Sequence, residues 1–593
     1  MCGVAGFVSL TGPRDRAGLT RLGRTMTGVL GHRGPDDRGV HVSGDGRVML
    51  ANTRLAVRDL SAAGHQPMAS PDGAVVLAYN GELYRNRGAP RSRWPARSGS
   101  DTEVLVQVLH AASDPAGSLA ALDGMFAAAW HDTRTGRVVL ARDHFGVKPL
   151  VYAVVDGGVL FASEPVALFA SGLLAPAFDA TTFLAKAYVR MDAADDRTWF
   201  AGVRVLPPAH LLVLDPDTGA GAGAVRPRPY WTPAVADEPV TPEQVRAAFD
   251  EAVRLRLPSD VPQAALVSGG FDSSAGFGAL CRLGGQVRPY VVRYEGPGVG
   301  QNDDLPYAQQ AVRFWGREPV LCDVRVRDLP GLVDRVVTRL GRPLLHGAEL
   351  AMHCSYQRVL DEGGTVVYSG HGADELWGYQ DGRYFPIVAP DFRPDMHSPY
   401  YLRHLLYRQE RPGWHRMLDR LAAALGVPDD EITERVWSVT LAAYRELDTL
   451  DPHKRGRYHL MRRFLVYVND MVDGLSSGFS LEDRPLFQDV QLAELAFGMP
   501  EYVKNREGPT DFKPFLKQAL RDLVPESVLT RPKQGFPAPD DPAYRDRLRA
   551  LVIGAGLPGG LALSAGELAE LGIGELMFLY STRRWLDLYA LPG

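Results

Sequence analysis

The first 200 residues alternate short apolar runs with polar turns. Stretches such as GVHVSGDGRVMLANTRLAV and AVVLAYNGELY are rich in β-branched and aromatic residues and contain glycine, asparagine and aspartate between the runs, a pattern typical of β-strands. The hexapeptide DTRTGR at 132–137 separates two apolar runs and predicts a hairpin turn. This part of the chain is therefore predicted to form an antiparallel α+β sandwich.

The hydrophobic period changes after residue 240. Thr241 is a candidate N-cap with Gln244 three residues later, and an amphipathic helical pattern follows. Strand-like runs, among them AALVSGG, RPYVVRYEG, PVLCDV and TVVYSG, then alternate with helical segments. Alternation of this kind indicates a doubly wound parallel sheet. From about residue 380 the pattern is mostly helical.

A chain of 593 residues is too long for a single core, so at least two domains are expected. Residues 215–230, DPDTGAGAGAVRPRPY, are rich in glycine, alanine and proline and favour a linker or an exposed loop. We therefore predict one domain at 2–205, a linker at 206–235 and a second domain at 236–593.

Composition excludes several functions. The net charge is −5 and acids and bases are interspersed, which gives no electrostatic support for a nucleic-acid or membrane partner. Four cysteines do not make a disulfide framework, and no apolar run approaches the roughly 18 residues that span a bilayer, so a cytoplasmic protein is expected. Only seven of the 65 basic residues are lysines, so a lysine within a motif is a candidate for function.

Cys2 is a candidate nucleophile. Its small side chain favours removal of the initiator methionine, which would leave a cysteine with a free α-amino group. That amine has a reference pKa near 8 and can accept the thiol proton, directly or through water. A Met-Cys start also arises by accident, so the surrounding residues decide its meaning.

Six further motifs accompany the cysteine over about 170 residues. They are HRGPDDRG (32–39), TRLAVRD (53–59), YNGELY (79–84), SGSDTE (98–103), DGMFAAAW (123–130) and RDHFGVKPL (142–150). In order and spacing they resemble the glutaminase domain of class II, N-terminal-nucleophile amidotransferases of the asparagine synthetase type. The resemblance implies an αββα sandwich and assigns 2–205 to glutamine hydrolysis. Cys2 would attack the glutamine amide, and the Asn80 side chain and the Gly81 N–H would hold the oxyanion.

The same resemblance implies a binding site for the rest of the glutamine molecule. Arg54 would bind the α-carboxylate, for which an arginine fork is suited. Glu82 and Asp101 would bind the α-ammonium. Without the motifs, ordinary surface charge would explain Arg54 and Asp101. Arg85 stands where relatives usually have asparagine.

In the second predicted domain, the motif ALVSGGFDSSAG at 265–276 lies where a strand ends and a helix begins. Gly269 and Gly270 let the backbone approach an anion, and the following helix N-terminus offers free N–H groups. No lysine follows, so this is not a P-loop of the GxxxxGK[ST] type. Asp272 would repel a phosphate unless a cation intervened, which implies Mg²⁺.

SGGxDSS resembles the pyrophosphatase loop of enzymes that cleave ATP between its α- and β-phosphates, again as in asparagine synthetases. The resemblance implies ATP and Mg²⁺, adenylation of a carboxylate, and attack of an amine on the acyl-adenylate. Asp272 and Asp374 would hold Mg²⁺, and Lys513 in DFKPFLKQAL would face the pyrophosphate and the adenylate, whereas Lys533 in RPKQGF is interpreted as structural. The residues that would contact the nucleotide are Leu266, Ser268, Gly269, Gly270, Asp272, Ser273, Ser274, Val292 and Gly370. SLEDRPLFQD at 480–489 resembles the family's SLEVRVPFLD.

The motif SGHGADE at 369–375 differs from the relatives at His371, where asparagine synthetases have glutamate. An imidazole with a reference pKa near 6.5 can accept a proton from an incoming amine. The alternative is that His371 only hydrogen-bonds the loop. In the related β-lactam synthetases the same position holds a tyrosine, so it varies with the acceptor.

The segment LGRPLLHGAELAMHC at 340–354 differs as well. Relatives carry a polar cluster there that is associated with the aspartate acceptor, whereas this chain has leucine, glycine and alanine, with Arg342 near the position of an acid. A site for the α-amino and α-carboxyl groups of aspartate needs paired charges. We therefore predict an amidotransferase acting on another carboxylic acid, such as a natural-product intermediate.

Other interpretations stay open. A true asparagine synthetase is the conservative one, and an intramolecular ligase such as a β-lactam synthetase or a lasso-peptide cyclase is the second. The glutaminase residues Cys2, Arg54, Asn80 and Asp101 are all present, which disfavours a cyclase because a cyclase needs no ammonia. The residues of both predicted sites are complete, which disfavours a catalytically inactive scaffold. Residues 380–465 could form a lid, an acceptor pocket or an oligomer surface. For the oligomeric state, a homodimer is one of the options left open.

Overall fold

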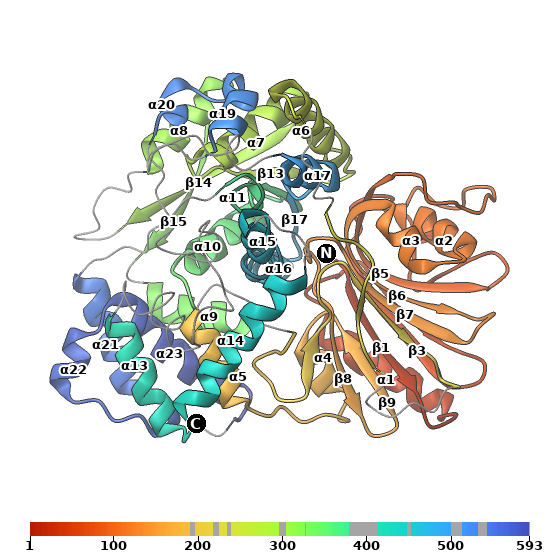
Figure 1. Ribbon diagram of the computed structural model, residues 1–593, viewed down its shortest axis with the longest axis horizontal. Coiled ribbons are helices and arrows are strands. Elements are labelled where there is room, and N and C mark those ends of the chain that lie inside the picture. The colour runs from red at the N-terminus through yellow and green to blue at the C-terminus, as the bar shows by residue number, and fades with distance from the viewer. Residues whose placement is uncertain are drawn as a thin grey trace.

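The computed structural model contains the whole chain in two parts that lie side by side (Figure 1). The residues that the structure describes are 1–189, 196–217, 225–233, 239–295, 304–325, 328–378, 412–446, 452–499, 513–531 and 542–591. Within these ranges no helix has both the length and the hydropathy needed to cross a membrane.

Two six-stranded antiparallel sheets form the centre of the N-terminal part (Figure 1). The first has the order β10-β8-β9-β1-β3-β2 and comprises β1 (Gly3–Ser9), β2 (Asp37–Val42), β3 (Val48–Arg54), β8 (Val151–Val155), β9 (Gly158–Ala162) and β10 (Val203–Val205). The second has the order β12-β11-β7-β6-β5-β4 and comprises β4 (Met68–Ala69), β5 (Val75–Asn86), β6 (Leu122–Asp132), β7 (Arg137–Arg142), β11 (His210–Leu214) and β12 (Arg228–Pro229).

Helices cover the outer face of each sheet, so the layers are αββα. The first sheet packs against α1 (Arg16–Val29) and α4 (Pro165–Ala170), and the second against α2 (Asp101–Ala111) and α3 (Pro115–Ala120). Along β1, Val4 and Val8 pack between the sheets, whereas Ala5 and Phe7 pack beneath the helices. A strand covered on both faces is apolar throughout, which explains its strong sequence signal. The predicted sandwich and the hairpin at 132–137 are confirmed.

The predicted linker at 206–235 is wrong over its first part. Residues His210–Leu214 form β11, which pairs with β7. Leu211 and Leu212 are fully buried in the sandwich, because this short apolar run completes the second sheet before the glycine-rich stretch begins. Residues 218–224 and 234–238 lie outside the described ranges.

A five-stranded parallel sheet, in the order β15-β14-β13-β16-β17, forms the centre of the C-terminal part. Its strands are β13 (Gln263–Leu266), β14 (Val287–Glu295), β15 (Val320–Arg325), β16 (Val366–Ser369) and β17 (Glu482–Pro485). One face is covered by α6 (Pro242–Arg256), α7 (Phe271–Arg282), α8 (Asp304–Phe314) and α17 (Val490–Gly498), and the other by α10 (Ala348–Asp361) and α16 (Leu465–Ser477). The doubly wound prediction is confirmed, as is the capping box of Thr241 and Gln244.

The remaining helices join the two parts. Helix α5 (Ala180–Val189) leaves the sandwich and packs among C-terminal helices, where the Phe183 ring stacks on Trp585 with 6.1 Å between centroids. These helices are α9 (Leu329–Leu340), α13 (Pro412–Ala424), α14 (Asp429–Glu446), α15 (Pro452–His459), α21 (Pro542–Ala555), α22 (Ala565–Glu570) and α23 (Ile573–Leu588). Short helices α11 (Ala373–Trp377), α19 (Pro514–Leu520) and α20 (Glu526–Leu529) lie near the parallel sheet. Of the segment 380–465, residues 380–411 and 447–451 lie outside the described ranges.

Candidate active site

Cys2 and Arg54 lie at the same end of the first sheet. They are neighbours because β1 and β3 pair with Gly3 opposite Thr53. The Cys2 Sγ lies 3.9 Å from the Leu55 carbonyl oxygen, and burial raises the pKa of the thiol. In this form of the chain Met1 precedes the cysteine, and burial lowers the pKa of the Met1 amine to about 5. After removal of Met1, the α-amine of Cys2 would be the group that accepts the thiol proton.

Asn80 and Gly81 lie in the middle of β5, on the sheet that faces β1. Both polar atoms of the Asn80 side chain are buried and have no hydrogen-bond partner among the described residues. An unpaired buried amide costs about 1–3 kcal/mol, which marks this group as available for a ligand. At Gly81 φ is +153° and a Cβ would lie 2.0 Å from the Met125 carbonyl oxygen, so the position requires glycine.

The Arg54 guanidinium is held by backbone carbonyls alone. It donates to the carbonyl oxygens of Ser61 at 2.8 Å, Arg58 at 3.4 Å and Asp59. It forms no ion pair with a described carboxylate, so its charge remains for an anionic ligand. The geometry therefore allows the predicted contact with the glutamine α-carboxylate.

Glu82 and Asp101 are buried carboxylates that influence each other. Asp101 accepts hydrogen bonds from the Leu83 N–H at 2.7 Å and the Tyr79 hydroxyl at 3.2 Å. Glu82 lies 3.2 Å from the Arg484 guanidinium of β17. Burial is the main cause that raises the pKa of both carboxyls. An α-ammonium bound between them would lower both pKa values again, since a nearby cation favours the charged carboxylate.

The loop from β13 to α7 contains the residues predicted to hold phosphate. At Gly269 φ is +80° and a Cβ would lie 2.6 Å from the Asp304 carbonyl oxygen, so only glycine fits. The Ser268 and Ser273 hydroxyls lie 2.9 Å apart, and the Ser274 hydroxyl is buried without a partner among the described residues. Arg531 donates to the Gly269 carbonyl at 3.3 Å. The sequence analysis did not identify Arg531, although this residue begins the RPKQGF motif. Lys533 of the same motif lies outside the described residues.

The other predicted nucleotide contacts gather at the carboxyl ends of three adjacent strands. Leu266 ends β13, Val292 lies in the second half of β14, and Gly370 follows β16. A Cβ at Gly370 would lie 2.8 Å from the Ser273 nitrogen, so the β16 loop packs directly on the phosphate loop. The strand order reverses at β13, which has β14 on one side and β16 on the other. The crevice at such a reversal is the usual ligand site of a doubly wound sheet.

Lys513 lies between the two carboxylates predicted to hold magnesium. Its Nζ is 2.7 Å from Asp272 and 2.5 Å from Asp374, and its side chain is buried. The structure therefore brings together three residues that are far apart in the sequence. Asp272 Oδ1 is buried and has no partner among the described residues, which fits a hard oxygen ligand for Mg²⁺. The described residues contain no group of three or more candidate protein ligands, and Mg²⁺ bound with ATP commonly takes one or two carboxylates, phosphate oxygens and water.

His371 faces a small cavity between the two parts of the molecule. The cavity has a volume of about 10 Å³ and is also lined by Lys148, Asp473 and Asp483, so it is about the size of one water or ammonia molecule. Neither ring nitrogen of His371 hydrogen-bonds to a described residue, which disfavours the interpretation that it only supports the loop. Burial lowers its pKa to about 4, so the imidazole is neutral at pH 7 and is a weaker base than an exposed histidine.

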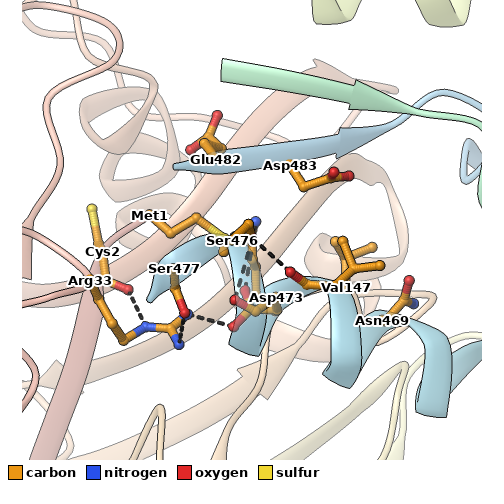
Figure 2. Close-up of polar contacts among 12 residues, drawn as sticks. Met1, Cys2, Arg33, Val147, Asn469, Asp473, Ser476, Ser477, Glu482 and Asp483 are labelled. Atoms are coloured by element: carbon orange, nitrogen blue, oxygen red, sulfur yellow. Dashed lines mark hydrogen bonds and ion pairs between the residues drawn. The ribbon is translucent and has the colours of Figure 1, made fainter. Parts of the chain in front are cut away.

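A polar network connects this cavity with Cys2 (Figure 2). Arg33 donates to the Cys2 carbonyl oxygen at 3.0 Å and forms an ion pair with Asp473 at 2.7 Å. The Met1 side chain extends from the Cys2 end toward α16, and its Sδ lies 2.5 Å from the Lys148 Nζ. Removal of Met1 would therefore vacate space between the cysteine and the cavity at His371.

Sequence reasoning missed most of this network. Asp483 could have been found, because the corresponding position of the family motif SLEVRVPFLD is valine. Its carboxylate accepts hydrogen bonds from the Ser369 hydroxyl at 2.6 Å and the Tyr356 hydroxyl at 2.9 Å. Burial raises the pKa of Asp483 to about 6. Lys148 also had a signal, because it is one of the few lysines and lies in the motif RDHFGVKPL. Arg33 and Asp473 give no comparable signal, because charged residues are usually solvated.

These two sites define a class of enzyme: ATP-dependent carbon–nitrogen ligases that take nitrogen from glutamine. Residues 1–231 match the glutamine amidotransferase domain family, and residues 244–555 match the asparagine synthase family. The chain belongs to the asparagine synthase family, as the resemblance of its motifs implied.

Three relatives illustrate the range of the family. Asparagine synthetase 3 of Bacillus subtilis is 29% identical over 92% of this chain and 88% of its own length. Asparagine synthetase 2 of the same organism is 30% identical, over 92% of this chain and 73% of its own length. Amidase chry2 of Gibberella zeae is 25% identical, over 91% of this chain and 89% of its own length.

Proposed function

We propose that this enzyme adenylates a carboxylic acid other than aspartate and converts it to a primary amide with ammonia released from glutamine at Cys2. A small-molecule acceptor from natural-product biosynthesis is the class we favour. The proposal rests on the pairing of charged side chains in the segment 340–354. In this segment the charged groups that could bind an amino acid are already paired with each other.

Arg342 and Glu349 form a buried ion pair at 2.8 Å. The Glu349 carboxylate also accepts hydrogen bonds from the Tyr467 hydroxyl at 2.9 Å and the Leu345 N–H at 3.1 Å. Breaking a buried pair of this kind costs about 3–5 kcal/mol. Neither charge is therefore readily available to the α-amino or α-carboxyl group of aspartate, which supports a different acceptor.

The first half-reaction uses the residues around Cys2. The amine at the mature N-terminus takes the thiol proton, and the thiolate attacks the glutamine amide carbon. Asn80 and the Gly81 N–H hold the oxyanion, the protonated amine gives its proton to the leaving nitrogen, and the C–N bond breaks to release ammonia. Water then hydrolyses the thioester to glutamate and restores the thiol.

The second half-reaction uses the crevice of the parallel sheet. The acceptor carboxylate attacks the α-phosphorus of ATP, and pyrophosphate leaves along the loop of Ser268 to Ser274. Asp272 and Asp374 would hold Mg²⁺, whose charge offsets that of the phosphates. Lys513 stabilises negative charge on the phosphates as the bond breaks. Ammonia then attacks the acyl carbon, His371 takes the proton that the nitrogen loses, and AMP leaves.

An asparagine synthetase is the second candidate. It is favoured by the names of the two Bacillus subtilis relatives, whereas Amidase chry2 and Amidase chyE of Penicillium rubens carry names without aspartate or asparagine. An intramolecular ligase is disfavoured because the groups around Cys2 are complete and their polar atoms are available.

A screen of carboxylic acids for acceptor-dependent pyrophosphate release would decide between these candidates. We expect aspartate to give release no greater than the acceptor-free background, and at least one other acid to raise it about tenfold or more. Mass spectrometry should then detect the primary amide of that acid when glutamine is present. Release with aspartate alone would refute the proposed acceptor class and leave asparagine synthesis as the function.

Replacement of His371 by glutamine tests the proton acceptor. Glutamine keeps a polar side chain of similar reach but cannot take a proton at neutral pH. We expect amide formation from ammonia to fall about tenfold to a hundredfold, while acceptor-dependent exchange of pyrophosphate into ATP is retained. His65→Gln, at a half-exposed histidine of the N-terminal part, is the control. An unchanged amidation rate would mean that His371 does not accept the proton.

A further inference from the structure

A large cavity lies between the two parts of the molecule, next to the small cavity at His371, and Asp473 of α16 lines both. Its volume is about 830 Å³, within the range of about 300–1,000 Å³ that small-molecule sites occupy. Tyr467, Asp470 and Gly474 line this cavity, whereas Asn469 and Val472 line the small one. These two sets lie on different faces of α16. The large cavity is therefore distinct from the small one, but Asp473 lines both, and Arg342 and Leu345 of the segment 340–354 form part of its wall.

The N-terminal side of the cavity is aromatic. Phe169, Trp199 and Phe200 line it together with Tyr589 from the end of the chain. The Phe200 ring lies edge-on to Phe169 and to Tyr589, with 4.8 Å between centroids in each pair. Such a wall suits an aromatic ring, because rings prefer offset and edge-to-face contacts at this spacing.

The acidic residues of the wall all lie beside arginines. Glu164 and Asp473 both pair with Arg33 at 2.7 Å. Asp470 lies 3.4 Å from Arg342, and Asp334 lies 2.8 Å from Arg584. Each of these carboxylates therefore has an arginine partner, and Arg33 and Arg342 each serve two acids.

Three arginines of the wall have no carboxylate partner among the described residues. Arg335 and Arg339 lie one turn apart on α9 and therefore share a face. Arg142 is buried, and its donors reach only backbone carbonyls, at 2.8 to 3.0 Å. Arg335 and Arg339 therefore supply positive charge to this cavity that no described carboxylate pairs with.

We propose that this cavity binds an aromatic organic anion, a ring that carries a carboxylate, sulfonate or phosphate. The ring would pack against Phe169, Trp199 and Phe200, and the anionic group would be held by Arg335 and Arg339. Since Arg33 lines the cavity and holds the Cys2 carbonyl oxygen, an occupant would touch the contact between the two parts of the enzyme. The inference does not depend on the identity of the acceptor.

Titration of the full-length enzyme with 8-anilinonaphthalene-1-sulfonate, an aromatic sulfonate, tests this site by fluorescence. We expect one molecule to bind per chain. The double variant R335Q/R339Q should weaken binding about tenfold, and R335K/R339K should stay within about threefold of the parent, because lysine keeps the charge. Arg313→Gln, an exposed arginine of α8 paired with Glu318, should change nothing. Equal affinity of R335Q/R339Q and the parent would overturn the proposal.

The position of the ligand is tested separately with crystals soaked in 4-bromobenzoate. The bromine should give an anomalous peak beside Phe169 and Trp199, with the carboxylate toward α9. A peak at another place, or none, would also overturn the proposal.

Discussion

Replacement of Cys2 by alanine is expected to lower glutamine hydrolysis by about 10⁴-fold or more, while amide formation from ammonium salts is retained. The thiol is the only group at this site that can form the thioester, and loss of a nucleophile removes the whole covalent route. The synthetase crevice lies on a separate sheet and keeps its own residues. Glutamate release from glutamine and amide formation with glutamine or ammonium chloride would be measured in parallel.

Cys281→Ala is the matched control, since this free cysteine lies on α7 rather than in the sandwich. It should keep both activities. Continued glutaminase activity in Cys2→Ala would show that another residue is the nucleophile. Loss of ammonia-dependent amidation as well would show that Cys2 also supports the synthetase site.

Replacement of Lys513 by methionine is expected to slow acyl-adenylate formation by about 10²–10³-fold, the usual effect of removing one group that stabilises transition-state charge. Lys513 is buried between Asp272 and Asp374, so the variant loses a positive charge where the phosphates would lie. Acceptor-dependent exchange of labelled pyrophosphate into ATP measures this step directly. Glutamine hydrolysis, carried out in the other part of the molecule, should continue.

Lys517→Met removes a lysine one turn further along α19 and should leave exchange within about twofold of the parent. If Lys513→Met exchanged pyrophosphate at the normal rate, the lysine would serve only to separate the two acids. A parallel loss of glutaminase activity would instead indicate a folding defect.

Much of the fold could be predicted because its elements have strong local patterns. The strands around the phosphate loop are buried on both faces, so they read as continuous apolar runs. The capping box at Thr241 was also visible, since its two partners are three residues apart. Strand β11 was missed because its five residues precede a glycine-rich stretch, and pairing with β7 depends on a partner that lies about 70 residues earlier in the sequence.

The site was predictable to a different extent in each part. The motifs identified Asn80, Gly81, Asp272 and Lys513 as candidate site residues, because the chemistry needs particular residue types in a particular order. The motifs did not reveal that the Asn80 amide is unpaired or that Lys513 lies between two carboxylates. Those facts depend on which side chains approach from other elements.

The amino-acid order alone determined the two kinds of sheet, and it supplied the candidate nucleophile, the candidate phosphate loop and the departure at His371. These features are local, because hydrophobic period, caps and turn residues act over a few positions. Only the tertiary structure decided the rest: the Arg33–Asp473 ion pair, whose partners are 440 positions apart, the self-paired Arg342 and Glu349, and the cavity between the two parts. Contacts between distant elements depend on how whole surfaces pack, and no short stretch of sequence records that.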